Sequence, residues 1–138
     1  MKRVLIIEDE QDIVDIATVI LEYEGYEVCS FTRFEGFEEK VKVCQPDLVL
    51  LDLNLKGYYG RDICKYIKEN SILKHVPVIL MSANRDIKAV KEESGADAFL
   101  RKPFDLQDFI DIVKTYINSP AKVPDLQLQS GGDLLSVA

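Results

Sequence analysis

The chain has 138 residues, of which 47% are hydrophobic and 30% charged, and this length suits a single domain that buries a core without disulfides. The formal net charge of -7 and the scattered lysines and arginines argue against direct nucleic-acid binding. No apolar run approaches the ~20 residues of a membrane-spanning helix, so we expect a cytoplasmic protein without a membrane contact.

Five short apolar segments alternate with five segments of helical character. The apolar segments are nearly continuous in hydrophobicity, which is typical of strands buried on both faces of a parallel sheet. We expect strands at 3–8, 26–31, 47–51, 78–81 and 96–100.

Apolar residues at helical spacing predict a helix after each strand. They are Ile13, Ile16, Ala17, Ile20 and Leu21 in the first helix; Phe34, Phe37 and Val41 in the second; Ile63, Tyr66 and Ile67 in the third; Ile87 and Val90 in the fourth, at about 86–94; and Leu106, Phe109, Ile110, Val113 and Ile117 in the fifth. Gly25 and Gly95 are expected to end the first and fourth helices, and Asp105 to be the N-cap of the last.

This alternation predicts an α/β fold in which right-handed crossovers place helices on both faces of a parallel sheet. Five units suit a flavodoxin-like, doubly wound, five-stranded sheet of strand order 2-1-3-4-5. The pattern stops at Ser119, so we expect a domain at 1–118 and a C-terminal tail or linker at 119–138.

The three cysteines, Cys29, Cys44 and Cys64, are odd in number and widely spaced. They form neither a disulfide framework nor a close metal pair, so we expect reduced, partly buried thiols. His75 is the only histidine, which excludes a histidine metal cluster.

Polar residues follow four of the expected strands, at the edge where ligands bind in a doubly wound sheet. They are Glu8 and Asp9 after the first strand, Asp52 after the third, Ser82 after the fourth, and Arg101 and Lys102 after the fifth. One charged residue at a strand end is ordinary, because the chain is reaching solvent there. A complementary set at one edge indicates a site.

The expected set combines three carboxylates with an ammonium group and a hydroxyl. Two carboxylates a few Å apart repel each other by roughly 4 kcal/mol at an effective dielectric constant of ~20, and a divalent cation removes that cost. Oxygen ligands favour a hard ion such as Mg²⁺. With Lys102 and Ser82 beside them, these groups suit phosphoryl transfer.

These residues resemble the receiver domain of two-component response regulators, and most closely the chemotaxis-type receivers. The resemblance covers about residues 2–118. It rests on Glu8-Asp9 after the first strand, Asp52 with Gly60 eight residues later, Ser82-Ala83 after the fourth strand and Lys102-Pro103 after the fifth. Each motif alone is weak, but the four in this order are specific.

The resemblance implies that Asp52 is the phosphoacceptor. It also implies that Mg²⁺, or Mn²⁺ in its place, is bound by Asp9, by Asp52, by the backbone carbonyl of Asn54 and, through water, by Glu8. The chain departs from the family pattern at Lys56, where proline is usual.

The resemblance further implies that Lys102 pairs with the phosphoryl group and that Ser82 donates a hydrogen bond to it. Phe99 is the expected aromatic switch residue, although it lacks the hydroxyl of a tyrosine. The bond from Lys102 to Pro103 is expected to be cis.

The family further implies a signalling switch that catalyses its own phosphorylation and dephosphorylation rather than an enzyme acting on other substrates. The donor is expected to be a histidine kinase or a phosphotransfer protein, and the output a contact with an unidentified downstream protein. The sequence leaves open whether phosphorylation also produces a homodimer.

Three other classes of protein compete with this interpretation. An aspartyl-phosphate-forming phosphatase needs a second acid at the position of Asn54 and a cap domain for which the chain has no room. A receiver-like interaction module that is never phosphorylated needs none of the site residues. A flavin-binding module would need a glycine- and hydroxyl-rich loop where Glu8, Asp9 and Glu10 stand.

Overall fold

The fold was determined from a computed structural model that describes residues 1–55, 59–70 and 72–118. Five parallel strands form one sheet in the order β2-β1-β3-β4-β5. The strands are β1 (Arg3–Ile7), β2 (Glu27–Phe31), β3 (Leu48–Asp52), β4 (Val78–Ser82) and β5 (Ala98–Arg101). The predicted strands and strand order are confirmed.

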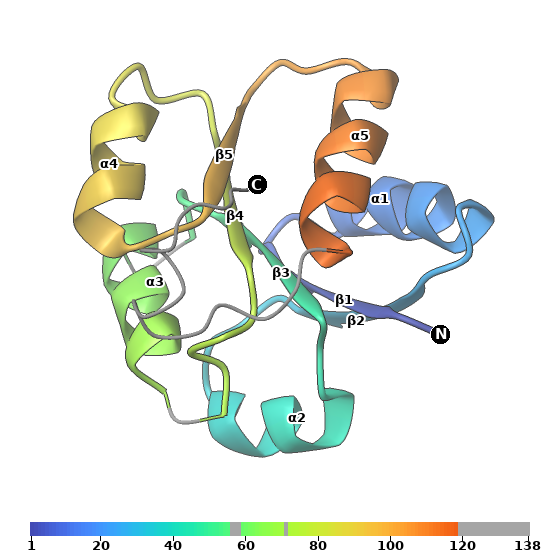
Figure 1. The fold of residues 1–138 in the computed structure, drawn as a ribbon, viewed down its shortest axis with the longest axis horizontal. Coiled ribbons are helices and arrows are strands. Elements are labelled where there is room, and N and C mark those ends of the chain that lie inside the picture. The colour runs from blue at the N-terminus through green and yellow to red at the C-terminus, as the bar shows by residue number, and fades with distance from the viewer. Residues whose placement is uncertain (56–58, 71, 119–138) are drawn as a thin grey trace, which may run out of the picture.

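Helices follow every strand and cover both faces of the sheet (Figure 1). They are α1 (Gln11–Tyr23), α2 (Phe37–Cys44), α3 (Gly60–Glu69), α4 (Ile87–Ser94) and α5 (Leu106–Ile117). Helices α1 and α5 pack on one face, and α2, α3 and α4 on the other. This is the doubly wound α/β arrangement that the alternating pattern predicts.

Successive residues of the central strands enter two separate hydrophobic cores. In β1, Val4 and Ile6 face the core under α1 and α5, whereas Leu5 and Ile7 face the core under α2, α3 and α4. The central strands β1, β3 and β4 are therefore apolar on both faces, which explains their continuous hydrophobic runs.

One N-cap residue and two glycines mark helix ends as the sequence predicts. The Asp105 carboxylate accepts a hydrogen bond of 2.8 Å from the backbone N–H of Asp108, and so caps α5. Gly95, the C-cap of α4, has a left-handed φ of 82°, and Gly25, just after α1, has a φ of 96°. Glycine adopts such angles without steric cost.

Three apolar residues expected on helix stripes are exposed instead. Tyr66 on α3 is 36% exposed, Ile16 on α1 is 62% exposed and Leu106 on α5 is 56% exposed. Ile16 and Leu106 line a groove of about 280 Å³ between α1 and α5. The spacing predicted a wider buried stripe than these helices have, because only the residues that point at the sheet lose all solvent contact.

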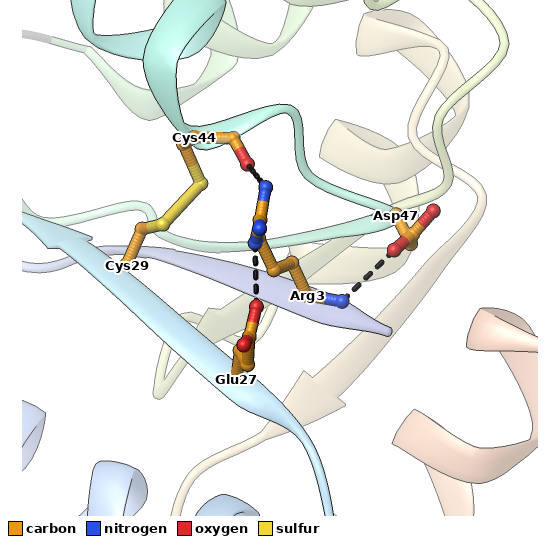
Figure 2. Close-up of a disulfide and its surroundings, with 5 residues drawn as sticks. All are labelled: Arg3, Glu27, Cys29, Cys44 and Asp47. Carbon is orange, nitrogen blue, oxygen red and sulfur yellow. Dashed lines mark hydrogen bonds and ion pairs between the residues drawn. A yellow bond between two sulfur atoms is a disulfide. The ribbon is translucent and has the colours of Figure 1, made fainter. Parts of the chain in front are cut away.

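The expectation of three reduced cysteines is wrong. Cys29 in β2 and Cys44 at the end of α2 form a disulfide with a Cα–Cα distance of 6.3 Å (Figure 2). Cys64 is a free, buried thiol in α3. Spacing in sequence could not reveal the pair, because packing of α2 against the sheet brings the two residues together.

Some predictions fall on residues that the structure does not describe. The tail at 119–138 and the family departure at Lys56 lie outside the described ranges, so both stay predictions. Among the described residues, no helix combines the length and the apolar character needed to cross a membrane.

Candidate functional site

The carboxyl ends of the central strands meet at one edge of the sheet. The register pairs Asp52 of β3 with Met81 of β4, and Ser82 of β4 with Arg101 of β5. Glu8 directly follows β1. Parallel strands in this register therefore deliver side chains that are far apart in sequence to one site.

Three carboxylates gather at this edge, as predicted. One oxygen from each of Glu8, Asp9 and Asp52 lies within 4.8 Å of the others. Glu8 and Asp52 are 0% and 3% exposed, whereas Asp9 is partly exposed. The cluster therefore has a buried floor and one side open to solvent.

The ammonium group of Lys102 faces two of these carboxylates. Its Nζ lies 3.5 Å from Asp52 Oδ1 and 3.6 Å from Glu8 Oε1. One positive charge beside three acidic groups leaves the cluster negatively charged when all of them are ionised. This imbalance favours either a bound cation or a retained proton.

Glu8 holds a proton more tightly than an ordinary glutamic acid does. Burial, followed by the charge of Asp52 and a hydrogen bond with it, raises the pKa of Glu8 from 4.5 to about 7, against the opposing effects of Lys102 and the Glu10 amide. Within the described residues, Glu8 Oε1 is buried and accepts no hydrogen bond. A buried oxygen in this state suits a hard, oxygen-binding cation such as Mg²⁺.

Backbone contacts hold Glu8 and the loop after β3 in place. The backbone N–H of Glu8 donates to the carbonyl of Phe31 at 3.1 Å, which ties the acidic pair to the end of β2. A Cβ atom on Gly60 would lie 2.5 Å from the Cα of Leu53, so only glycine lets α3 start this close to the residue after Asp52.

Ser82 and Lys102 are joined through the backbone at the ends of β4 and β5. The Lys102 N–H donates to the Ser82 carbonyl at 2.9 Å. Ser82 is fully buried, and its hydroxyl oxygen accepts a 3.0 Å hydrogen bond from the Asn84 N–H, a contact that sequence reasoning missed. The Lys102–Pro103 bond is cis, as predicted.

The other expected site residues lie around this centre. Phe99 is partly buried against the core under α2, α3 and α4. Arg101 was expected to converge with the acidic groups, but it is exposed and its guanidinium lies 5.8 Å from the centre of the Phe99 ring. Asn54 is exposed, two residues beyond β3.

The sheet order defines a flavodoxin-like α/β protein with an acidic cluster at the carboxyl edge of its sheet, and comparison with known proteins agrees on the fold. The family model described as "Response regulator receiver domain" matches residues 4–114. The chain therefore belongs to the response regulator receiver domain family, whose members act in two-component systems.

Two curated relatives are transcriptional regulators. The chain is 31% identical over 126 residues to the DNA-binding dual master transcriptional regulator RpaA of Synechocystis sp., covering 90% of the chain and 52% of RpaA. It is 30% identical over 132 residues to the DNA-binding response regulator MtrA of Mycolicibacterium smegmatis, covering 94% and 57%. The chain thus spans about half the length of these relatives.

Solved structures agree on the fold. A putative response regulator from Chloroflexus aurantiacus is 28% identical with a TM-score of 0.77, covering 86% of this chain and 98% of that one. The response regulator TrrA from Thermotoga maritima, solved in complex with Mg²⁺-BeF, is 27% identical with a TM-score of 0.73, covering 84% and 99%.

Proposed function

We propose that this receiver domain accepts a phosphoryl group on Asp52 in a Mg²⁺-dependent reaction and changes shape to control a partner protein. The observation that carries the proposal is the buried acidic cluster with the Lys102 ammonium 3.5 Å from Asp52. No other described part of the chain combines a nearly buried carboxylate, further acidic groups and a cation in this way.

The metal ligands are the side chains of Asp9 and Asp52 and the backbone carbonyl of Asn54, with Glu8 acting through a water molecule. Their oxygen-only donor set fits Mg²⁺, with Mn²⁺ as a substitute. A bound dication would neutralise charge on the phosphoryl oxygens. The solved TrrA complex with Mg²⁺-BeF supports this choice of metal.

The donor is a phosphohistidine of a histidine kinase or a phosphotransfer protein. A carboxylate oxygen of Asp52 attacks phosphorus, the P–N bond breaks, and the departing histidine nitrogen keeps the electron pair. The product is an acyl phosphate on Asp52, and Lys102 pairs with its negative oxygens. His75 is no internal donor, because it precedes β4 at the opposite edge of the sheet.

The response to phosphorylation begins at Ser82 and Lys102, whose side chains follow the new oxygens. The loop after β4 moves with them, and Phe99 turns inward. Helix α4 lies in the path of this change and buries only Ile87, Val90 and Ser94. Such limited anchoring suits an element with two arrangements that differ by a few kcal/mol.

The output is a protein–protein contact in the cytoplasm, made by this switched surface or by a phosphorylation-dependent homodimer. The domain itself makes no direct contact with nucleic acid in this proposal, because the formal charge of the 138-residue chain is -7. The DNA-binding regulators it resembles are about twice its matched length, so DNA contact in such proteins is compatible with a separate domain.

Phosphorylation by a small donor tests the proposal. The protein is incubated with acetyl phosphate and MgCl₂, and its intact mass is measured, with parallel samples in EDTA. We expect one added phosphoryl group in wild type and none in Asp52→Asn or in EDTA. The exposed α5 variant Asp111→Asn is the matched control and should behave as wild type.

Three outcomes would overturn the proposal. Absence of phosphorylation with every donor and metal would favour an interaction module of receiver fold. Equal phosphorylation of Asp52→Asn would move the acceptor elsewhere. Multiple turnover of small phosphoesters would favour an aspartyl-phosphate phosphatase.

A further inference from the structure

The disulfide between Cys29 and Cys44 links the edge strand of the sheet to the end of a helix (Figure 2). Neither cysteine has a role in the proposed phosphoryl transfer. Strand β2, which carries Cys29, pairs only with β1 in the described sheet. Cys44 is the last residue of α2. The bond therefore joins two peripheral elements rather than the centre of the fold.

A small thiol can reach this disulfide from solvent. Both cysteines line a surface pocket of about 450 Å³ on the α2 side of β2. Cys29 is partly exposed, whereas Cys44 is 4% exposed. An incoming thiolate therefore reaches the Cys29 sulfur first, and Cys44 becomes the leaving thiolate. Accessible disulfides are the ones that exchange readily.

Positive charge lies near the backbone of Cys44, the residue that supplies the leaving sulfur. The Arg3 guanidinium donates from Nη1 to the carbonyl oxygen of Cys44 at 2.8 Å, so it sits next to that residue (Figure 2). Lys40 lines the same pocket, together with the acidic Glu39. Glu27 pairs with Arg3 at 2.7 Å through the other side of the guanidinium and offsets part of this charge. A nearby cation stabilises a thiolate and so assists its departure.

We expect the fold to form without the bond. The five-stranded sheet has a hydrophobic core on each face, and a domain of this size buries enough apolar surface to fold without cross-links. Arg3 bridges the same elements noncovalently, because it contacts both Glu27 of β2 and Cys44 of α2. Opening the disulfide thus leaves β2 and α2 connected.

From these observations we infer that Cys29 and Cys44 form a reversible redox-modification site that exchanges with a low-molecular-weight thiol and its disulfide, such as reduced and oxidised glutathione. One glutathione thiolate attacks Cys29, forming a mixed disulfide and releasing the Cys44 thiolate, which takes up a proton. A second glutathione thiolate attacks the glutathione sulfur of the mixed disulfide. The products are oxidised glutathione and the Cys29 thiol, so two electrons and two protons reach the protein.

The third cysteine serves as an internal reference. Cys64 is fully buried in α3, and burial raises the pKa of its thiol. It should stay reduced under every glutathione ratio. Oxidised protein then contains one thiol, and reduced protein contains three.

Thiol counting on the full 138-residue chain tests the inference. Protein is equilibrated at graded ratios of reduced to oxidised glutathione, quenched in acid, denatured and alkylated, and its mass gives the number of free thiols. We expect a single transition from one alkylated thiol to three, which reverses when the ratio is reversed. Circular dichroism should show a folded protein at both ends.

Peptide mapping and one variant complete the test. In the oxidised sample, the cross-linked peptides should contain Cys29 and Cys44. Cys29→Ser should show no such transition, because Cys44 has lost its partner. The inference fails if wild type has three thiols in oxidised glutathione alone, or if Cys64 is in the bond. It also fails if the bond survives the highest concentration of reduced glutathione while the protein is folded.

Discussion

Lys102 and Asp52 are 50 residues apart in sequence, yet the Lys102 ammonium lies 3.5 Å from Asp52 Oδ1. The same Nζ is 3.6 Å from Glu8 Oε1, so one ammonium group lies beside two buried carboxylates. A dication bound by these acids would be repelled by Lys102, whereas a phosphoryl group on Asp52 would attract it. The residue therefore has opposite effects on the two proposed ligands.

Replacing Lys102 with alanine should separate these effects. Without the ammonium charge, Mg²⁺ affinity should rise roughly 3- to 10-fold, because the repulsion between like charges is lost. The rate of phosphorylation by acetyl phosphate should fall roughly 100-fold, a typical cost of removing a group that stabilises transition-state charge. Mg²⁺ titration and intact-mass kinetics measure the two quantities.

Lys74→Ala is the matched control, since Lys74 is exposed and lies before β4, at the other edge of the sheet. It should leave both quantities unchanged. A Lys102→Ala protein that is phosphorylated as fast as wild type would remove Lys102 from the proposed mechanism.

The raised pKa of Glu8 predicts how stability depends on pH in metal-free protein. Its pKa is about 7 in the fold against an ordinary 4.5, so the folded state holds the proton more tightly. Folding stability should therefore fall as the pH rises from about 4.5 to about 7, and level off above that. Urea unfolding in EDTA across this range measures the decline.

Glu8→Gln removes the titrating group and should weaken this decline. At pH 8 in EDTA, the variant should be more stable than wild type by about 1–3 kcal/mol, because a buried negative charge has gone. Glu22→Gln, at an exposed position of α1, should match wild type. Equal stability of wild type and Glu8→Gln at pH 8 would refute the prediction.

Gly60→Ala should destabilise the domain through a steric clash. The new Cβ would lie 2.5 Å from the Cα of Leu53, and backbone atoms cannot move aside as a flexible side chain can. Overpacking of this kind costs about 1–3 kcal/mol. Arg61→Ala, at the next and exposed position, should stay within about 0.5 kcal/mol of wild type. Chemical denaturation of both variants gives the comparison, and equal stabilities would count against the close approach.

Reducing the Cys29–Cys44 disulfide should lower the free energy of unfolding. The two cysteines are 15 residues apart, and closing a loop of that length stabilises a protein by about 3 kcal/mol in the chain-entropy model. Urea unfolding with and without reductant measures the loss. The double variant Cys29→Ser/Cys44→Ser should not respond to reductant, and an equal response would trace the effect to another group.

Much of the fold could be predicted because the central strands are buried on both faces. Continuous apolar runs such as Val49–Leu51 are readable without any knowledge of contacts, and Gly95 and Asp105 mark helix ends by local geometry. The acidic cluster was predictable for a related reason, since parallel strands bring their carboxyl ends to one edge. The roles of its residues in phosphoryl transfer stay predictions.

The features that sequence reasoning missed all depend on tertiary packing. The Cys29–Cys44 pair arises where α2 docks beside the edge strand, and odd cysteine numbers carry no information on that contact. Ile16 and Leu106 fit a helical stripe but are exposed and line a groove. Arg101 ends β5, yet its guanidinium lies 5.8 Å from the centre of the Phe99 ring instead of joining the acidic cluster.

The strict division of strand residues between two cores limits where this chain can change length. One residue inserted within β3 would send the side chains after it to the opposite faces and would turn Asp52 away from Glu8. Insertions in a loop that joins a helix to the amino end of the next strand would leave this alternation of side chains between the two cores unchanged. Side chains along a strand alternate between the two cores with a period of two residues. Insertions and deletions that preserve function should therefore fall in the connections between helices and strands.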